Sequence, residues 1–469
     1  MDVTRLNFAE ALREFREAVA ECDFAAMDME MTGLYESKEQ QPHRLDSADE
    51  RYAKLKRSVE TYGVMQVGIS LFTWREDGDG GFYEARPFNF NVFPATTVGR
   101  TPVETHMGFK NTALEFLARN SFDFNKWVYS GIPFLRAEDA NRIRAERAAL
   151  LGGRQAMVVA DDGATRAFVR GIERALRAFA ASGERTLRCE TANAYQRKIV
   201  HDMAARHDTL ATRGIDGDVE VFRVTRKEMA KLAAKRLRLL DASIDEARGF
   251  CAVVDLLSAA RKPVVGHNMP LDVLHAYAKF HRALPSTRVA FEQAVAGFLP
   301  VLIDTKYIIE STPAIKARYK TSSLEDIAPM LELEAARDPG RPLVRFHPRF
   351  AHTAAHKVMH EAGYDAYITG ATFIRLLKLD GGIDLAARAT SASEHGGELV
   401  LYRYINRLYM LFGDDMAWRV GGGGGGSGGS GRSSSGDSRS ARAASPAKDK
   451  EEAPTSAMEN DADSSVLHG

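Results

Sequence analysis

Two acidic residues follow a short apolar segment near the start of the chain. Residues 24–27 read Phe-Ala-Ala-Met, a pattern typical of a buried strand, and Asp28 and Glu30 come directly after them. Side chains two positions apart on a strand point to the same face, so both carboxylates are expected side by side at a strand end. Adjacent carboxylates repel each other unless a cation lies between them. The pair is therefore a candidate cation site at a strand end.

Two later segments carry further candidate ligands. The strand-like segment 262–265 runs into a turn with Asn268 and then a helix with Asp272, and far along the chain His360 and Asp365 lie five residues apart. Carboxylate ligands suit hard divalent cations, Mg²⁺ or Mn²⁺, better than zinc. Two such ions a few ångströms apart could bind both the attacking and the leaving oxygen of a phosphodiester displacement.

Each of these segments alone has an ordinary explanation. Two acids at a strand end are most often solvated, Asp272 alone is more often a helix cap or a surface charge, and a His five residues before an Asp is nearly uninformative. Their order along the chain is more specific, because it is the order found in the DEDD 3′-exonucleases.

A series of spaced segments extends this resemblance over roughly residues 1–380. In chain order they are NFAEALREF, DFAAMDMEMTGL, ERYAKLK, QVGISLF, FNFNVFP, FDFNKWVYSGIPFL, GHNMPLDVLH, LPVLIDTKYI, TSSLEDI and HEAGYDAYITG. In these segments the sequence resembles the poly(A)-specific ribonucleases, which are deadenylases of the DEDDh family. The resemblance implies an α/β fold with an RNase H-like DEDD exonuclease domain.

The resemblance also implies a set of site residues. Asp28, Glu30, Asp272 and Asp365 would bind two Mg²⁺ ions, with Mn²⁺ as a possible substitute, and His360 would be the general base that activates a water. The implied protein is a homodimeric 3′-to-5′ exoribonuclease, a hydrolase that shortens the poly(A) 3′ ends of single-stranded RNA in mRNA decay and releases 5′-AMP.

Three residues beside the predicted ligands are expected to bind the substrate. Met31 and Leu34 would stack on the 3′-terminal nucleotides and Asn268 would donate or accept a hydrogen bond, because single-stranded RNA is recognised through its splayed bases. Met31 and Leu34 are equally compatible with a place in the core. Asp304 belongs to a matching segment, and we expect it to be structural rather than a further ligand.

Other functions remain open at this point. A 3′-end trimming exonuclease of small non-coding RNAs would share every catalytic residue, and a DNA-directed DEDD exonuclease is a weaker match to the segments. A catalytically weak RNA-binding scaffold would normally have lost one of the ligands. His352, His356 and His360 share a helix face and invite a zinc site, but the family pattern requires only His360.

The pattern of predicted helices and strands changes around residues 152–235 and divides the nuclease into two parts. We expect its first part at residues 1–151, an inserted α/β module at 152–235 and its second part at 236–419. The module contains Arg197 and His201, an RxxxH spacing that names a small single-stranded nucleic-acid-binding fold, in which Arg197, Lys198 and His201 would contact phosphates. Arg206 and His207 are further candidates. An ordinary exposed basic helix face would look the same.

The last part of the chain differs in composition. Residues 420–469 hold six consecutive glycines and a polar segment with almost no apolar side chains, so a disordered tail is expected. Longer family members continue after about residue 380 into an RRM-like domain. Residues 401–420 are too short for one, so recognition of the 5′ cap is not expected.

Composition limits the location and partners of the protein. The 63 Lys and Arg balance the 63 Asp and Glu, which argues against non-specific binding of polyanions, although a balanced total can hide a local basic groove. Three scattered cysteines, Cys22, Cys189 and Cys251, suit a reducing compartment. No apolar stretch is long enough to span a membrane, so we expect a nuclear or cytoplasmic protein without a membrane partner.

Local patterns predict several regular elements. A helix with the apolar face Phe8, Leu12, Phe15 and Val19 should precede the first strand, a charged helix should cover 44–62, and strands should cover 64–74 and 82–94.

Overall fold

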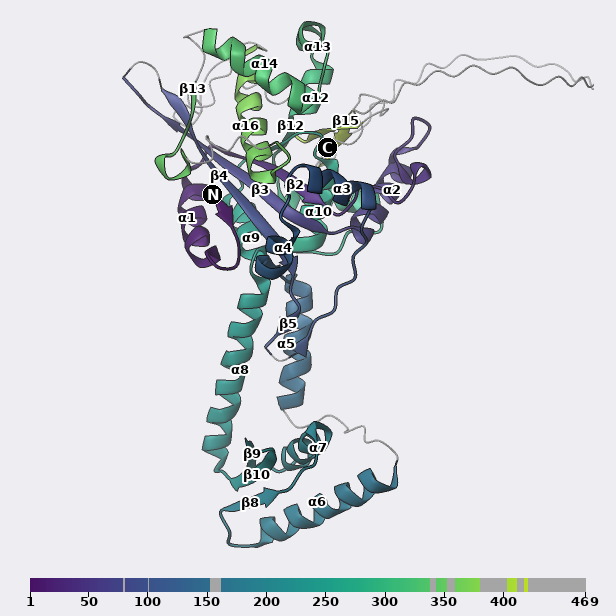
Figure 1. The fold of residues 1–469 in the computed structure, drawn as a ribbon, viewed down its shortest axis with the longest axis vertical. Coiled ribbons are helices and arrows are strands. Elements are labelled where there is room, and N and C mark those ends of the chain that lie inside the picture. Colours follow the sequence, from purple (N-terminus) through teal and green to yellow (C-terminus); the bar gives the residue numbers. More distant parts are fainter. Residues whose placement is uncertain are drawn as a thin grey trace, which may run out of the picture.

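A mixed sheet with helices on both of its faces forms the main body of the protein, and two long helices connect it to a small α/β unit (Figure 1). The computed structural model describes residues 1–78, 81–99, 101–151, 162–337, 343–351, 359–379, 403–410 and 417–420. The predicted tail beyond residue 420 lies outside the described residues, as do His352 and His356. Among the described residues, no helix has the length and apolarity needed to cross a bilayer.

The main sheet joins strands from both ends of the chain. In spatial order they are β1 (Asp2–Val3), β4 (Phe82–Pro94), β3 (Val64–Arg75), β2 (Phe24–Met31), β11 (Val264–Gly266), β12 (Leu302–Asp304), β14 (Arg407–Tyr409) and β15 (Ala417–Arg419). Two more strands, β7 (Ile132–Phe134) and β13 (Leu343–Phe346), pair with β4. Strand β2 is antiparallel to β3 and parallel to β11, so it lies at the centre of the sheet.

The last two strands come from the segment that is too short for an RRM. Strand β14 runs parallel to β12, and β15 pairs with β14 in the antiparallel sense. This segment therefore extends the nuclease sheet.

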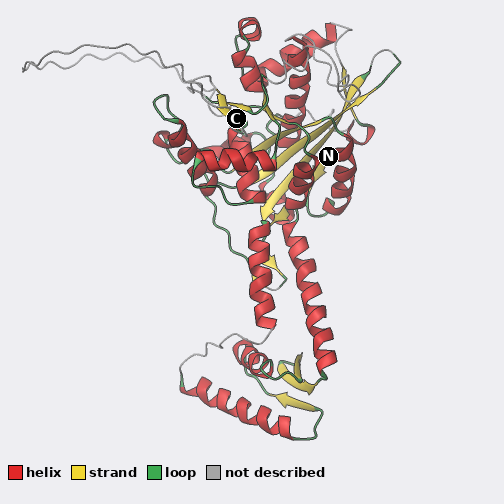
Figure 2. Cartoon of the chain, turned by 180° about the vertical axis from the view of Figure 1, so that it is seen from behind, coloured by secondary structure: helices red, strands yellow, loops and turns green. Residues whose placement is uncertain are grey.

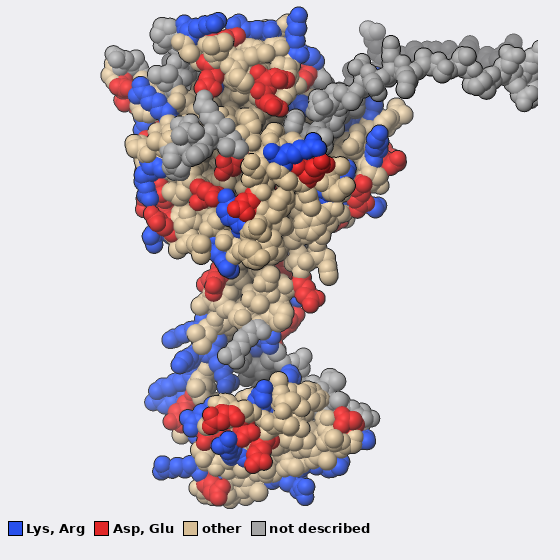
Figure 3. Space-filling model, viewed as in Figure 1, with Lys and Arg blue, Asp and Glu red and all other residues tan. Residues whose placement is uncertain are grey.

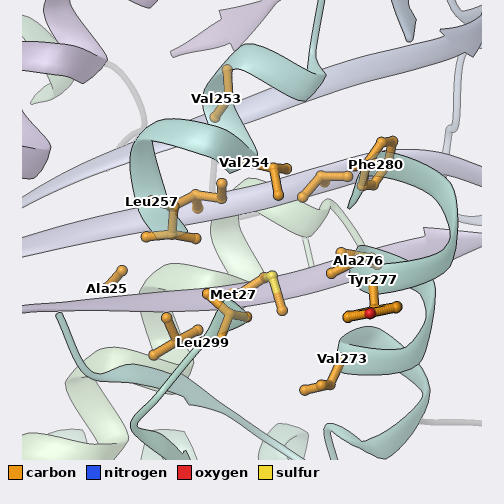
Figure 4. Packing of buried hydrophobic residues seen from close by; sticks show 14 of the residues in the cluster. Ala25, Met27, Val253, Val254, Leu257, Val273, Ala276, Tyr277, Phe280 and Leu299 are labelled. Carbon is orange, nitrogen blue, oxygen red and sulfur yellow. The ribbon is translucent and has the colours of Figure 1, made fainter. Parts of the chain in front are cut away.

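Alternate side chains of β2 enter two separate cores. Ala25, Met27, Met29 and Met31 belong to the cluster on one face, and Phe24 and Ala26 belong to the cluster on the other. Figure 4 shows Ala25 and Met27 packed near side chains of the helices that cover the first face. By the same alternation, Asp28 and Glu30 continue the face of Phe24 and Ala26.

Each face has its own set of helices. The first is covered by α1 (Phe8–Glu21), α2 (Ala48–Thr61), α9 (Cys251–Ala260), α10 (Pro270–His275), the π-helical turn η2 (Ala276–His281) and α11 (Arg288–Phe298). The second is covered by α12 (Thr305–Ser311), α13 (Pro313–Tyr319), α14 (Leu324–Arg337) and α16 (Ala362–Leu379). Smaller elements are η1 (Lys38–Gln40), β5 (Thr97–Val98), β6 (Thr101–Pro102), α3 (Asn111–Arg119), α4 (Phe124–Ser130) and η3 (Pro348–Phe350).

The two long helices form a stalk, which Figure 2 shows from behind. They are α5 (Ala137–Leu151) and α8 (Arg226–Arg248), and they pack through an apolar cluster that includes Ile143 and Ile244. Arg144 Nε also donates to Asp241 Oδ1 at 2.6 Å across the pair. The predicted module boundary at residue 235 falls inside α8, which continues to the main body.

The small unit beyond the stalk has a core of its own. It consists of α6 (Gly163–Ala181), β8 (Thr186–Cys189), α7 (Ala194–Ala204), β9 (Leu210–Ile215) and β10 (Asp218–Arg223), with the strands in the order β8-β10-β9. Side chains from both helices and the sheet form one apolar cluster. The assignment of this unit to the RxxxH fold stays a prediction.

Candidate active site

The acids of β2 meet a third acid from α16. Helix α16 covers the face of the sheet that carries Asp28 and Glu30, and Asp365 stands in its first turn. Carboxylate oxygens of Asp28, Glu30 and Asp365 all lie within 4.8 Å of one another. Acids separated by more than 300 residues in sequence thus form one cluster.

Two glycines allow α16 to approach the sheet this closely. Gly68 of β3 lies opposite Asp28, and a Cβ added to it would stand 1.7 Å from the carbonyl oxygen of Ala362. A Cβ added to Gly363 would stand 2.6 Å from Cβ of Asn89. Because neither position has a side chain, the start of α16 packs directly against the strands.

The turn before α16 places His360 beside Asp365. The backbone of His360 is left-handed, with φ of 66°, and its N–H donates to Asp365 Oδ2 at 3.0 Å. Asn89 of β4 holds the following residues: its Nδ2 donates to Glu361 Oε1 at 2.8 Å, and its Oδ1 accepts from the Gly363 N–H at 3.2 Å. The ring of His360 packs edge-to-face on Phe116, with 4.7 Å between centroids.

The fourth predicted acid arrives from α10. Strand β11 is parallel to β2 and ends in a turn where Asn268 has φ of 56°, and α10 then carries Asp272, which is 2% exposed. The charge of Asp272 raises the pKa of both Asp28 and Glu30, after burial, so it belongs to the same electrostatic group.

Asp304 shapes the turn that leads to Asp272. Its carboxylate accepts hydrogen bonds from the backbone N–H groups of Asn268 (2.9 Å), Met269 (3.2 Å), Lys306 (3.0 Å) and Tyr409 (2.9 Å). All of these partners are main-chain donors, which agrees with the structural role expected for Asp304.

Burial and mutual repulsion raise the pKa values of all four acids. For Asp28, Glu30 and Asp365, burial is the main cause of the higher pKa, and the charges of the neighbouring acids add to it. Burial raises the pKa of Asp272 to about 8, with a further contribution from Asp304, while backbone hydrogen bonds oppose the shift. Negative charge is therefore costly here without a cation.

The acid cluster suits a divalent cation. Its donors are carboxylate oxygens, the ligands that Mg²⁺ and Mn²⁺ prefer. Asp365 Oδ1 is buried and has no hydrogen-bond partner among the described residues, although Asp365 Oδ2 has one. Such an oxygen is available to a metal ion.

Two adjoining pockets meet at Glu30. The first, of about 80 Å³, is lined by Asp28, Met29, Glu30, Phe116, His267, Leu324, Glu325, Met359, His360 and Asp365. The second, of about 140 Å³, is lined by Met29, Glu30, Met31, Leu34, Tyr35, Gln41, Lys110, Thr112, Ala113, Phe116 and Leu117. A polymer end placed among the acids would have an apolar cavity directly beside it.

The predicted substrate residues are placed differently. Met31 and Leu34 line the second pocket. Met31 also packs in the core, so its side chain belongs both to the pocket wall and to the core. Asn268 lines neither pocket, and its backbone N–H is bonded to Asp304.

The sequence analysis missed Phe116 and His267. Phe116 touches the ring of His360 and lines both pockets, but nothing in its helix sequence distinguishes it from a core residue. His267 lies five residues before Asp272, and a lone histidine in a strand-to-helix turn does not by itself predict a ring in the pocket. Burial lowers the pKa of His267 to about 3, so this ring is neutral at pH 7.

The predicted nucleic-acid contacts of the small unit lie on α7, at the far end of the stalk (Figure 1). Arg197 Nη1 donates to the carbonyl of Gly217 at 3.2 Å, and Lys198 pairs with Asp202 at 2.6 Å. His201 is half-buried, and its Nδ1 lies 2.8 Å from Thr212 Oγ1. All three side chains make contacts within the unit.

Comparisons with known proteins relate the chain to ribonucleases. A family model described as CAF1 family ribonuclease matches residues 3–373. Poly(A)-specific ribonuclease PARN of Danio rerio is 29% identical over 439 residues, which are 87% of this chain and 65% of that protein. PARN of Xenopus laevis is 27% identical over 400 residues, 80% of this chain and 62% of that protein. The chain thus spans less than two thirds of the length of these two relatives.

Two further similarities complete the comparison. The pre-piRNA 3′-exonuclease trimmer of Bombyx mori is 28% identical over 388 residues, 80% of this chain and 71% of that protein. A solved structure of S. pombe Pop2p, in a form with Mg²⁺ and Mn²⁺ bound, covers 87% of this chain and 98% of its own, with 15% identity and a TM-score of 0.40.

The family match covers most of the chain and includes Asp28, Glu30, Asp272, His360 and Asp365. Together with the mixed sheet, it confirms the predicted α/β class and the RNase H-like exonuclease domain. The chain belongs to the CAF1 family of ribonucleases.

Proposed function

We propose that this protein is a divalent-metal-dependent 3′-to-5′ exoribonuclease that shortens poly(A) ends of RNA and releases 5′-AMP. One observation carries the proposal: Asp28, Glu30 and Asp365 cluster within 4.8 Å, with His360 in the same pocket and Asp272 in the same electrostatic group. The similarity to poly(A)-specific ribonucleases supports poly(A) as the substrate.

The four acids would hold the metal ions, and we propose two Mg²⁺ with Mn²⁺ as a substitute. Bound there, divalent cations supply Lewis-acid stabilisation of the charge that builds up on the phosphate and on the departing 3′ oxygen. The protein contributes a set of half-buried and buried carboxylates, whose mutual repulsion would fall when cations bind.

His360 would accept the proton of the attacking water. The hydrogen bond from its backbone N–H to Asp365 and its contact with Phe116 set the place of the ring in the pocket. A neutral imidazole beside anionic ligands is a suitable proton acceptor.

The second pocket would receive the terminal base. Met31, Leu34 and Phe116 offer apolar surface beside Glu30, and stacking on such side chains is a common way to hold single-stranded RNA. This placement would leave the last phosphodiester over the acids.

Trimming of small non-coding RNAs is a second candidate, favoured by the similarity to the Bombyx mori trimmer. Substrate profiling separates the two functions, because both use the same site. A structured RNA with a short oligo(A) end that is processed faster than free oligo(A) would favour trimming.

The decisive experiment incubates the purified protein with 5′-labelled oligo(A), oligo(U) and oligo(C), with Mg²⁺ or with EDTA. We expect stepwise shortening of oligo(A) with Mg²⁺ and none with EDTA. The Asp28→Asn variant serves as the matched control and should be inactive with unchanged circular dichroism. Absence of degradation with either Mg²⁺ or Mn²⁺ would overturn the proposed poly(A) activity.

The homodimer and the nuclear or cytoplasmic location remain proposals drawn from the family resemblance. Analytical ultracentrifugation of the full chain tests the first, and microscopy of a tagged full-length protein tests the second.

A further inference from the structure

The N-terminal half of the stalk helix α8 carries a concentrated positive charge. Between residues 226 and 238 the sequence holds six Lys or Arg and a single acid, Glu228, in a chain whose total charge is zero. Glu228 is engaged in the capping box at Thr225, where its carboxylate accepts hydrogen bonds from the Thr225 N–H and hydroxyl. The charge of this helix half is therefore not neutralised locally.

Four of the cations share one side of the helix, here called the basic stripe: Lys227, Lys231, Lys235 and Arg238. They occupy positions i, i+4, i+8 and i+11, which span an arc of about 80° and a length of about 17 Å in an α-helix. All four side chains are exposed. Half-buried Met229, Leu232 and Leu240 lie on the opposite side of the helix. The apolar side of α8 is therefore partly covered by the protein, and the basic stripe faces the solvent.

The basic stripe forms no ion pair within the described part of the chain, although, after the hydrogen bonds from Thr225, the charge of Lys231 helps to lower the pKa of Glu228. None of its four residues forms an ion pair with a described acid, whereas Arg144, on the neighbouring stalk helix, pairs with Asp241 of α8. In Figure 3, Lys and Arg side chains gather along the α8 side of the stalk. Like charges at i, i+4 destabilise a helix, and cations near a helix N-terminus oppose the helix dipole. The arrangement therefore works against the stability of α8.

The charge continues from the stalk toward the small unit. Arg236 of α8 and Arg197 of α7 both act on the ring of His201 and lower its pKa, after the larger effect of burial, while Asp202 opposes them. Asp202 is already paired with Lys198. Arginines from α8 and α7 thus act on the same half-buried ring.

We propose that the basic stripe binds the phosphate backbone of the substrate RNA upstream of the 3′ end that enters the active site. This inference rests on the proposed function for its choice of RNA as the polyanion. An exposed row of cations along a helix matches a sequence-independent phosphate backbone, and it needs no base-specific group. The stalk would then retain a long tail while its end is shortened.

The test compares two double variants with equal loss of charge. Lys231→Gln/Lys235→Gln removes the centre of the basic stripe, and Arg13→Gln/Arg16→Gln removes two exposed arginines of α1 as the control. Glutamine is a good helix former, so both helices should remain folded. The affinity of the full chain for fluorescent 30-nucleotide oligo(A) is measured in EDTA over a series of salt concentrations.

We expect the stripe variant to bind about tenfold more weakly near 0.1 M salt, with a salt slope smaller by about 1.4, because each phosphate contact on a single strand contributes roughly 0.7. The α1 variant should bind as the parent protein does. Equal losses in both variants would show that only net charge matters and would overturn the inference, as would unchanged binding by the stripe variant. Binding of poly-glutamate as tight as that of oligo(A) would indicate an acidic protein partner instead.

Activity with Mg²⁺ separates this inference from the proposed function. The stripe variant should shorten four-nucleotide oligo(A) at the parent rate, because such a strand spans only about 14 Å at 3.4 Å per nucleotide. Its KM for 30-nucleotide oligo(A) should rise about tenfold. If the parent protein binds RNA through the stripe but degrades no substrate, the proposed function fails and the binding surface stands.

Discussion

The carboxylate of Asp365 accepts a hydrogen bond at 3.0 Å from the backbone N–H of His360. Asp365 Oδ1 has no hydrogen-bond partner among the described residues and is available to a metal ion, whereas Oδ2 holds the backbone of the proposed base. The position of His360 is therefore coupled to the position of the acid cluster.

His360→Ala should reduce kcat by about 10² to 10⁴-fold, the usual contribution of a general base. KM for oligo(A) should change little, because the ligands and the second pocket remain. Single-turnover rates and circular dichroism provide the measurement. A variant with parent-like kcat would remove His360 from the proposed chemistry.

Asn89→Ala should lower kcat without touching a ligand. The substitution removes the hydrogen bonds that hold Glu361 and Gly363 beside His360, and leaving buried partners unpaired costs about 1–3 kcal/mol. Asn91→Ala is the matched control, since Asn91, on the same strand, bonds to Asp2, Val3 and Gln66 instead. An equal loss of kcat in both variants, with equal loss of stability, would contradict a positioning role for Asn89.

Gly68→Ala should abolish activity and destabilise the fold. Its Cβ would collide with the backbone of Ala362 at 1.7 Å and push the start of α16 away from β2. Gly171→Ala on α6, where a Cβ meets nothing within 4 Å, should instead be stabilising by about 0.5–1 kcal/mol. Thermal melts and oligo(A) shortening assays report both effects.

Metal removal should make stability depend on pH. The folded pKa of Asp272 is raised from 3.8 to about 8, so this carboxyl favours the folded state at low pH, and that stability is lost as pH rises toward 8. The pKa values of Asp28, Glu30 and Asp365 are also raised, so these carboxyls add to the same pH dependence. In EDTA the melting temperature should therefore fall between about pH 5 and pH 8, and Mg²⁺ should restore it most at the higher pH. Asp28→Asn should flatten the fall in EDTA, and a parent-like slope in that variant would show that the cluster does not cause it.

Leu34→Ala should raise KM for oligo(A) with little change in global stability, because Leu34 lines the second pocket and is only half-buried. Met31→Ala should affect both KM and stability, since Met31 also packs in the core. Met27→Ala, on the same strand face but outside the pocket lining, controls for the loss of core packing. A parent-like KM in both pocket variants would show that the second pocket does not hold the base.

Much of the local structure could be predicted from the sequence. The expected strand at 82–94 has the bounds of β4, and the expected helix with Phe15 and Val19 on its buried face is α1. Strands β8 and β9 were not predicted, because they are short and mix polar and apolar residues without clear alternation. Asn7 is the N-cap residue of α1, but its side-chain oxygen accepts from the Thr4 N–H and not from the helix.

The sequence by itself determined that Asp28 and Glu30 share a face, because a strand has a period of two. The link between this pair and Asp272, His360 and Asp365 came from the resemblance to known family segments. The distances between these residues along the chain do not predict it. Only the tertiary structure decided that α16 packs against Gly68 and Asn89, that Phe116 reaches His360, and that α8 packs on α5 through Ile143 and Ile244. Periodicity depends on neighbours in the chain, whereas these contacts depend on the packing of segments that are distant in sequence.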